Sequence, residues 1–367
     1  MKRRFHLAAY ACAALAVWLA WLNSRPSPLL EPPLQRASPE PAGDEHLGLA
    51  SSYAPWIWHE VHPEKGRQDI PAAVDFDGNL DGRDNWETFP RFELVPTVYY
   101  AVVESGTHWF LTYHVFHPRD WEVFDLGLQL THEGDGENLQ VVVDKTSGEV
   151  VLLFAQAHYR GRAYANPSSR AFDGEQRLRA PLLLIGDDGR VDPSGPHAAV
   201  FVESRGHGIY GALDPSADLR IGADGQPHFR RRGIVLRPAA PSEEVGEPLL
   251  DAAAPVAYRL ESTLAKLWPL RESEELFDGW WPYERGGVAL ELPRFHRGDR
   301  FSGPLGSSRG ISPFAVDFRW CKGSLGALLL DPAGRWAEVL GVPEPWSLEY
   351  AENPFARSAT NPGSPRH

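Results

Sequence analysis

The chain has 367 residues, of which 43% are hydrophobic, and it contains 34 glycines and 33 prolines. These proportions are typical of a folded, turn-rich protein and exclude a wholly disordered one. The formal net charge of −13 at pH 7 argues against nucleic-acid binding and against simple electrostatic docking on anionic lipid, and it is compatible with cation binding.

The N-terminus has the pattern of an export signal. Lys2, Arg3 and Arg4 precede an uncharged run from Leu7 to Leu22, and such basic residues remain cytoplasmic. The run is long for a signal-peptide core, slightly short for a span of about 20 residues, and has bulky residues where small ones would mark cleavage. We interpret residues 1–22 as a signal peptide or an N-terminal membrane anchor. The protein would then be anchored in the inner membrane facing the periplasm, or periplasmic or secreted if the signal is cleaved.

The remaining chain divides by composition. Residues 23–52 are rich in proline and predict an extended linker. Residues 53–358 are expected to form one domain, with 241–358 as an alternative subdomain, and residues 359–367 a disordered tail. Beyond the N-terminal segment the chain has one cysteine, Cys321, so no internal disulfide is expected.

An early loop alternates acidic and amide residues. It resembles a calcium loop, although Leu80 stands at loop position six and Trp86 at position twelve, where an EF-hand has glycine and glutamate. An Asx turn explains the same pattern. We keep both interpretations for this second candidate ion loop, whose candidate ligands are Asp75, Asp77, Asn79 and Asp81.

Short β-branched and aromatic segments follow. Residues 97–104 and 108–116 flank a Ser-Gly-Thr turn and predict a hairpin. A helix is expected near residues 258–267, where three leucines share one stripe. Many short strands separated by turns predict a mainly β protein, an antiparallel β-sandwich with a few peripheral helices. Further strands are expected at residues 126–130, 139–144, 149–157, 181–185, 198–203 and 233–236.

The segment before the apolar run 139–143 carries His132, Asp135 and Glu137. If the strand extends back to Asp135, alternation places Asp135 and Glu137 on the face of the apolar residues. A carboxylate that faces a core requires a cation, a donor or a proton. Oxygen-rich ligands suit Ca²⁺, Mg²⁺ or Mn²⁺. The alternative is a polar turn with solvated charges.

Two further segments offer candidate groups. Asp120 ends a predicted strand and is either a further metal ligand or a turn cap, whereas His117 precedes a proline and is interpreted as a loop histidine. Later, a strand delivers Glu203, and His207 follows between two glycines, which permit close approach of backbone or of a ligand. The alternative for His207 is a loop histidine held by a hydrogen bond. Glu203 and His207 are therefore the catalytic candidates, as acid or base groups.

Three of these segments, in this order, resemble the NPP1/NLP family, the necrosis- and ethylene-inducing peptide 1-like proteins. They are residues 70–79, which match a P-A-V-D-x-x-G-N segment, residues 113–120, and residues 132–137, which stand where the family has G-H-R-H-D-W-E. The same pattern is similar to Vps62-related proteins. The likeness covers about residues 60 to 210.

The resemblance implies a β-sandwich that binds sphingolipid headgroups and holds a divalent cation. Carried over by position, the ligands are Asp120, His132, Asp135 and Glu137. Gly134 and Gly136 replace the family's second histidine and its tryptophan, and the family's disulfide is absent. Because of these departures, the resemblance supports a metal site more than it supports membrane-damaging activity.

We therefore predict an exported, divalent-cation-dependent binding protein that recognises a saccharide or a glycolipid headgroup, and we favour binding over catalysis. One alternative is a metal-dependent hydrolase of lipid or glycan esters, in which the ion activates water and His207 or Glu203 is the general base. Another is a non-catalytic envelope scaffold whose acidic loops are merely solvated.

Overall fold

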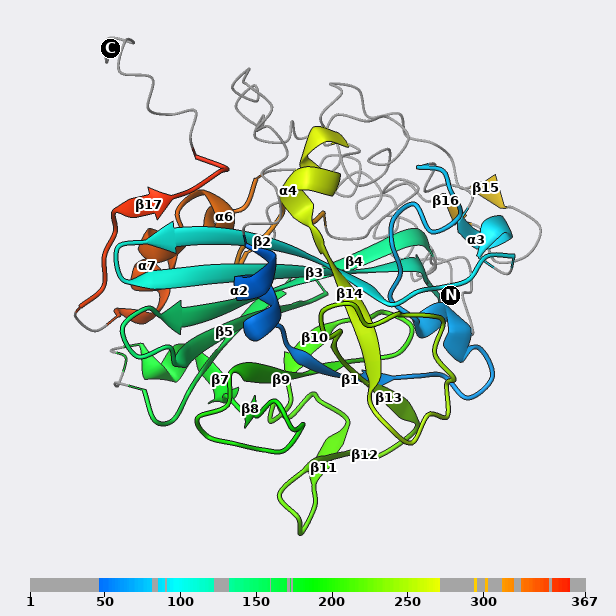
Figure 1. Ribbon diagram of the computed structural model, residues 1–367, viewed down its shortest axis with the longest axis horizontal. Helices are drawn as coiled ribbons and strands as arrows, with labels where there is room; N and C mark the ends of the chain where they lie inside the picture. The colour runs from blue at the N-terminus through cyan, green and yellow to red at the C-terminus, as the bar shows by residue number, and fades with distance from the viewer. Residues whose placement is uncertain are drawn as a thin grey trace, which may run out of the picture.

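A computed structural model of the chain (Figure 1) describes residues 46–80, 85–89, 91–121, 132–158, 160–169, 172, 174–270, 294–295, 301–302, 312–319, 325–342 and 345–356. The predicted signal or anchor, most of the linker, the strand expected at 126–130 and the predicted tail lie outside these residues. Within the described ranges, no helix is both long enough and apolar enough to cross a membrane.

One large sheet organises the described chain. Its strands, in spatial order, are β10 (Ile209–Gly211), β9 (His197–Val202), β1 (Trp56–Glu60), β13 (Gly233–Pro238), β14 (Val256–Ser262), β2 (Thr97–Ser105), β3 (His108–Asp120), β4 (His132–Asp144), β5 (Val150–Ala157), β6 (Arg160–Ala165) and β7 (Leu178–Pro181), with β17 (Tyr350–Glu352) paired to β2 and β8 (Leu184–Ile185) paired to β9. Two small ribbons stand apart, β11 (Leu219–Ile221) with β12 (Pro227–Phe229), and β15 (Arg294–Phe295) with β16 (Phe301–Ser302).

The mainly β prediction is confirmed, but the antiparallel sandwich is wrong. Strands β2 to β6 form the expected antiparallel meander, whereas β1 pairs parallel to β9, β13 to β14, and β14 to β2. The sheet is therefore mixed, and it curls into a nearly closed, barrel-like shape (Figure 1). The chain between β7 and β8 bridges its two ends, because Leu182 N–H donates to Ala165 O and Ala199 N–H donates to Leu183 O.

The two faces of the sheet bury different sets of side chains, as the two-residue period of a strand requires. On β3, Leu111, Tyr113 and Val115 face the enclosed core. Phe110 and Phe116 face the other way and are covered by the C-terminal part of the chain. That part includes α6 (Ala327–Leu330) and α7 (Pro332–Leu340), which lie beside the β2–β5 end of the sheet in Figure 1.

The helices that the structure describes are short. Besides α6 and α7 they are α2 (Leu47–Ser52), η1 (Gly66–Asp69), α3 (Asn85–Thr88), η2 (Glu175–Arg177), α4 (Thr263–Lys266) and η3 (Trp268–Leu270). Helix α2 occupies the end of the segment predicted to be linker, where Ala50 O accepts a hydrogen bond from the Tyr113 hydroxyl at 2.7 Å. The helix expected at 258–267 is wrong in its first half, which is strand β14. Pairing with β2 overrides the leucine stripe there, and α4 begins only after Ser262, whose hydroxyl accepts from Ala265 N–H.

Candidate metal centre

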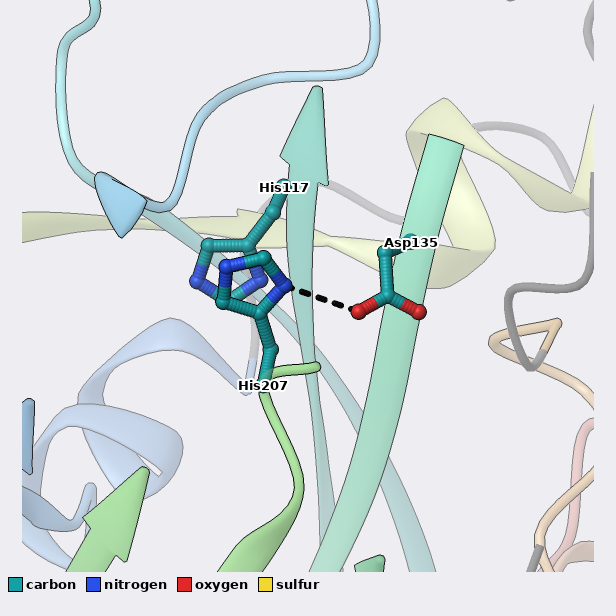
Figure 2. Close-up of side chains that lie close together, drawn as sticks. All are labelled: His117, Asp135 and His207. Atoms are coloured by element: carbon teal, nitrogen blue, oxygen red, sulfur yellow. Dashed lines mark hydrogen bonds and ion pairs between the residues drawn. The ribbon is translucent and has the colours of Figure 1, made fainter. Parts of the chain in front are cut away.

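Three buried side chains meet at one end of the enclosed core (Figure 2). His117 comes from β3, Asp135 from β4, and His207 from the loop between β9 and β10. His117 and Asp135 face each other because β3 and β4 pair in one continuous register, from His108 opposite Asp144 to Asp120 opposite His132. One ligand atom from each of the three residues lies within 4.8 Å of the other two. Such a group could hold a metal ion.

The two imidazole rings are stacked. Their centroids are 3.6 Å apart and their planes differ by 9° (Figure 2). His207 Nδ1 lies 2.8 Å from Asp135 Oδ2, and its Nε2 lies 3.4 Å from Asp69 Oδ1. Burial alone would lower the pKa of His207, but hydrogen bonds to both carboxylates and their charges raise it to about 9. At neutral pH the ring therefore carries a proton on each nitrogen.

The hydrogen bonds of His59 fix the tautomer of His117. His59 Nδ1 lies 2.8 Å from the backbone oxygen of Glu60, which can only accept, so Nδ1 carries the proton. Burial, and then the charge of His207, lower the pKa of His59 to about 4, and the same two causes hold the pKa of His117 well below its usual value. Both rings are therefore neutral. His59 Nε2 accepts from His117 Nε2–H at 2.8 Å, which leaves a lone pair on His117 Nδ1.

That lone pair is buried. Within the part of the chain that the structure describes, His117 Nδ1 has no hydrogen-bond partner. In Figure 2 this edge of the His117 ring lies on the side of Asp135. A buried nitrogen with a lone pair beside a carboxylate has the chemistry of a metal ligand.

Asp69 anchors the other side of His207. Its Oδ1 accepts from the backbone N–H of Arg205 at 2.9 Å and from Trp121 Nε1 at 3.3 Å, and its Oδ2 accepts from His62 N–H at 2.7 Å. The carboxylate is fully buried. These donors fix its position, and through it the orientation of the His207 ring.

Glu137 is the next inward-facing residue on β4. Its Oε1 accepts from His158 N–H at 3.1 Å, while its buried Oε2 has no partner within the described residues. Burial raises the pKa of Glu137 well above its usual value, and the charges of Asp135, Glu203 and Asp120 add to the rise. Several carboxylates thus gather around the buried Glu137.

A more exposed pair lies beside Glu137. His158 Nε2 is 2.5 Å from Glu203 Oε1, and the Tyr210 hydroxyl donates to the same oxygen at 3.4 Å. The hydrogen bond to Glu203 is the main cause that raises the pKa of His158. The His158 side chain is 58% exposed, so this pair is open to solvent.

Backbone strain concentrates at the site. Among the described non-glycine residues, φ is positive at His158 (51°), Arg205 (75°), His207 (47°) and Ser242 (68°). The first three surround the centre. Such conformations cost on the order of 1–3 kcal/mol each and cluster at functional sites.

The predicted residues are placed as follows. Asp135 and Glu137 share the inward face with Leu139, as the alternation predicted. Asp120 is half-buried at the end of β3, opposite His132 in the register, and the His132 side chain lies outside the described part. Asp120 is not in the His117–Asp135–His207 group, although its charge acts on Glu137.

The structure also bears on the sequence interpretations of His207, Glu203 and His117. His207 belongs to the buried group, whereas Glu203 pairs with His158. The interpretation of His117 as a loop histidine is wrong, because β3 continues through Pro118 to Asp120. His59 and Asp69 were missed. The alternation of Trp56 to Glu60 could have indicated a strand with His59 on an inward face, but Asp69 lies in a short 3₁₀ turn and no sequence pattern marks it.

The second candidate ion loop is partly described. Asp75 and Asn79 are exposed, and Asp81 lies outside the described residues. Both carboxylate oxygens of Asp77 accept from Asn79, Oδ1 from its backbone N–H at 3.1 Å and Oδ2 from its amide at 3.0 Å. Gly78 provides the positive φ of 84° that the turn requires. This is the geometry of an Asx turn.

Solved structures similar to this chain include three of NLPPya. A triple mutant of NLPPya is 16% identical with a TM-score of 0.32, and the match covers 65% of this chain and 85% of that one. NLPPya in complex with glucosamine is 22% identical with a TM-score of 0.28, and NLPPya in complex with mannosamine is 23% identical with a TM-score of 0.27. Each of these two matches covers 48% of this chain and 70% of the other.

These solved structures are of an NLP protein. NLP is the family that the sequence motifs resemble, and two of the three NLP-like segments form the ends of β3 and β4 at the candidate metal centre. No protein-family model matches the sequence, and no curated protein sequence matches it.

Proposed function

We propose that the protein is an exported, divalent-cation-dependent binding protein that recognises a saccharide or a glycolipid headgroup. The observation that carries the proposal is the buried Oε2 of Glu137, which has no partner among the described residues and lies among the charges of Asp135, Asp120 and Glu203. Like charges in a buried site repel one another unless a cation offsets them.

The donor set fits a divalent ion. Asp135, Glu137 and Asp120 offer carboxylate oxygens, and His132 is a ligand by resemblance to the NLP motif. Such oxygen-rich sets suit Ca²⁺, Mg²⁺ or Mn²⁺. These ions take more ligands than the four named residues supply in monodentate form, so positions remain for the hydroxyl groups of a sugar.

A melting experiment tests the cation. Full-length protein is stripped with EDTA and melted with and without added Ca²⁺, Mg²⁺ or Mn²⁺. We expect an ion-dependent rise in Tm that is lost in the Asp135→Asn, Glu137→Gln double variant and kept in Glu149→Gln, a change at an exposed turn residue. An unaltered Tm with every ion would reject the proposal in favour of a scaffold, and equal calorimetric ion affinity in the double variant would show that the ion does not bind at Asp135 and Glu137.

Sugar binding is tested on the same protein. Glucosamine and mannosamine are suitable probes, because NLPPya is described in complex with each. We expect calorimetric heats of binding that require the ion and vanish with EDTA. Equal heats of sugar binding with and without the ion would show that the sugar binds independently of the metal centre, which would contradict ion-dependent binding.

The proposed export has its own test. Full-length protein with a C-terminal tag is expressed in bacteria, and its accessibility to protease added outside the inner membrane is measured. We expect digestion without lysis of the cytoplasm. Protection equal to that of a cytoplasmic marker would contradict export.

One observation favours a second function, a metal-dependent hydrolase of lipid or glycan esters. The His158–Glu203 pair is solvent-exposed and adjoins Glu137, so it could exchange a proton beside an ion at the carboxylates. A bound ion would supply an activated water. His207 is a poorer base, because it already holds its protons. Turnover of an ester panel that falls with EDTA and in Glu203→Gln would support this function, and turnover that is absent would leave the binding function.

A further inference from the structure

We propose that His117 and His207 are direct ligands, through their Nδ1 atoms, of the ion that Asp135 binds, and that the centre therefore selects Zn²⁺ over Ca²⁺ and Mg²⁺. The inference rests on the proposed function and names the class of its ion. Imidazole nitrogens favour transition metals, whereas Ca²⁺ and Mg²⁺ prefer oxygen ligands.

The outer nitrogen of each ring faces an acceptor, as a hydrogen bond for His117 and as an ion pair for His207. A metal-binding histidine usually donates its other N–H to a carboxylate or another acceptor, which fixes its tautomer. His117 Nε2–H donates to His59 Nε2 at 2.8 Å. His207 Nε2 faces Asp69 Oδ1 at 3.4 Å. Both rings therefore keep Nδ1 for the side of Asp135.

His59 fixes the hydrogen bond on the Nε2 side of His117. Its own Nδ1–H is fixed on the backbone oxygen of Glu60, so it can only accept from His117. The other neutral tautomer of His117 would place two lone pairs in the 2.8 Å gap between the two Nε2 atoms. The lone pair on the buried His117 Nδ1 is thus imposed by the fold rather than chosen by a ligand.

The position an ion would take at His207 is occupied by a proton. That proton lies on the 2.8 Å line from His207 Nδ1 to Asp135 Oδ2. A divalent ion there replaces the proton and binds the same nitrogen and carboxylate, while Asp69 keeps the opposite N–H. Because the ring planes are within 9° of parallel, their in-plane lone pairs do not converge, and binding must tilt the rings apart.

Calorimetry with single metal ions tests the ligand assignment. ZnCl₂, MnCl₂ and CaCl₂ are each titrated into EDTA-stripped, full-length protein and into His117→Gln, His207→Gln and the control His228→Gln, an exposed histidine on β12. We expect Zn²⁺ to bind more tightly than Mn²⁺ and Ca²⁺, and each site variant to lose more than about 10-fold in Zn²⁺ affinity. His228→Gln should bind as the wild type does.

A measurement on the unaltered protein guards against variants that fail to fold. Long-range ¹H–¹⁵N spectra of histidine-labelled protein should show that Zn²⁺ shifts the Nδ1 resonances of His117 and His207 while both Nε2 atoms stay protonated. Asp69→Asn tests the outer contact, and we expect it to lower Zn²⁺ affinity about 10- to 100-fold with little change for Ca²⁺. A loss shared equally by all ions would instead indicate a merely structural role.

The outcomes separate this inference from the proposed function. If Glu137→Gln abolishes ion binding while both histidine variants bind every ion unchanged, or if the Nδ1 resonances do not move at saturating Zn²⁺, the histidine assignment is overturned and the carboxylate site stands. If the wild type binds no divalent ion, both fail.

Discussion

The imidazole of His117 lies flat against that of His207, with the ring centroids 3.6 Å apart. Two positive charges at that separation inside a protein would repel strongly, so only one of the rings is charged. The carboxylates of Asp69 and Asp135 place the charge on His207, and burial keeps His117 neutral. The stacked pair therefore consists of a positively charged ring, His207, and a neutral ring, His117, with a lone pair on Nδ1. The charge of the pair depends on pH.

Alkaline pH should destabilise the metal-free protein. Because the folded-state pKa of His207, about 9, lies above the ordinary value of 6.5, its contribution is complete below pH 6.5 and is lost as pH rises through 9. The loss is on the order of 3 kcal/mol. Urea unfolding in EDTA between pH 6.5 and 9 measures it. His207→Gln should flatten the profile, and a variant profile parallel to that of the wild type would refute the assignment.

Acid should destabilise the protein for the opposite reason. Burial is the main cause that lowers the pKa of His114 to about 4. Its contribution is therefore complete above pH 6.5 and is lost as pH falls towards 4. His114→Gln should lose less Tm than the wild type between pH 7 and 5, as followed by circular dichroism. The exposed His228→Gln should keep the wild-type profile, and equal acid sensitivity of all three proteins would contradict the prediction.

Glu137→Gln should stabilise the metal-free protein. The amide keeps the size of the side chain and removes a buried carboxyl whose charged form is opposed by burial and by Asp135. Relief equivalent to one pKa unit is about 1.4 kcal/mol, which raises Tm by roughly 2–3 °C in a domain of this size. Calorimetric melts in EDTA measure the change. The exposed Glu149→Gln should leave Tm unchanged, and a fall in Tm of Glu137→Gln would show that its carboxylate stabilises the fold.

Gly161 allows β6 to approach the C-terminal part of the chain. A Cβ at this position would clash with the Phe154 ring and lie 2.6 Å from the Phe318 Cα. Gly161→Ala should therefore cost about 1–3 kcal/mol. Gly48→Ala, in helix α2 with open space around it, should be neutral or gain up to about 1 kcal/mol. Urea unfolding compares the two, and equal effects would mean that the chain near Phe318 moves aside freely.

Local patterns made part of the fold predictable. The β-branched runs and glycine turns that predicted strands near residues 97–104, 108–116 and 149–157 are backbone preferences, and they correspond to β2, β3 and β5. The pairing of β1 with β9 joins segments about 140 residues apart in the sequence, and the pairing of β14 with β2 joins segments about 160 residues apart. Neither leaves a local signal, so the mixed sheet could not be derived from hairpins alone.

The sequence likewise indicated some residues of the candidate site and not others. Asp135 and Glu137 were accessible to sequence reasoning because they interrupt an apolar face with period two. His207 stood out between two glycines. His117 was misjudged because proline usually ends a strand, and Asp69 became visible only through the donors that converge on it.

The parallel pairing of β1 with β9 has a consequence for folding kinetics. His59 on β1 reaches His117 only after segments far apart in the sequence have closed a long loop, which is slow compared with forming the β2–β5 hairpins. The meander can therefore form early, while the histidine cluster is assembled among the last contacts. An ion that binds this cluster would leave the early folding steps unchanged and would mainly slow unfolding.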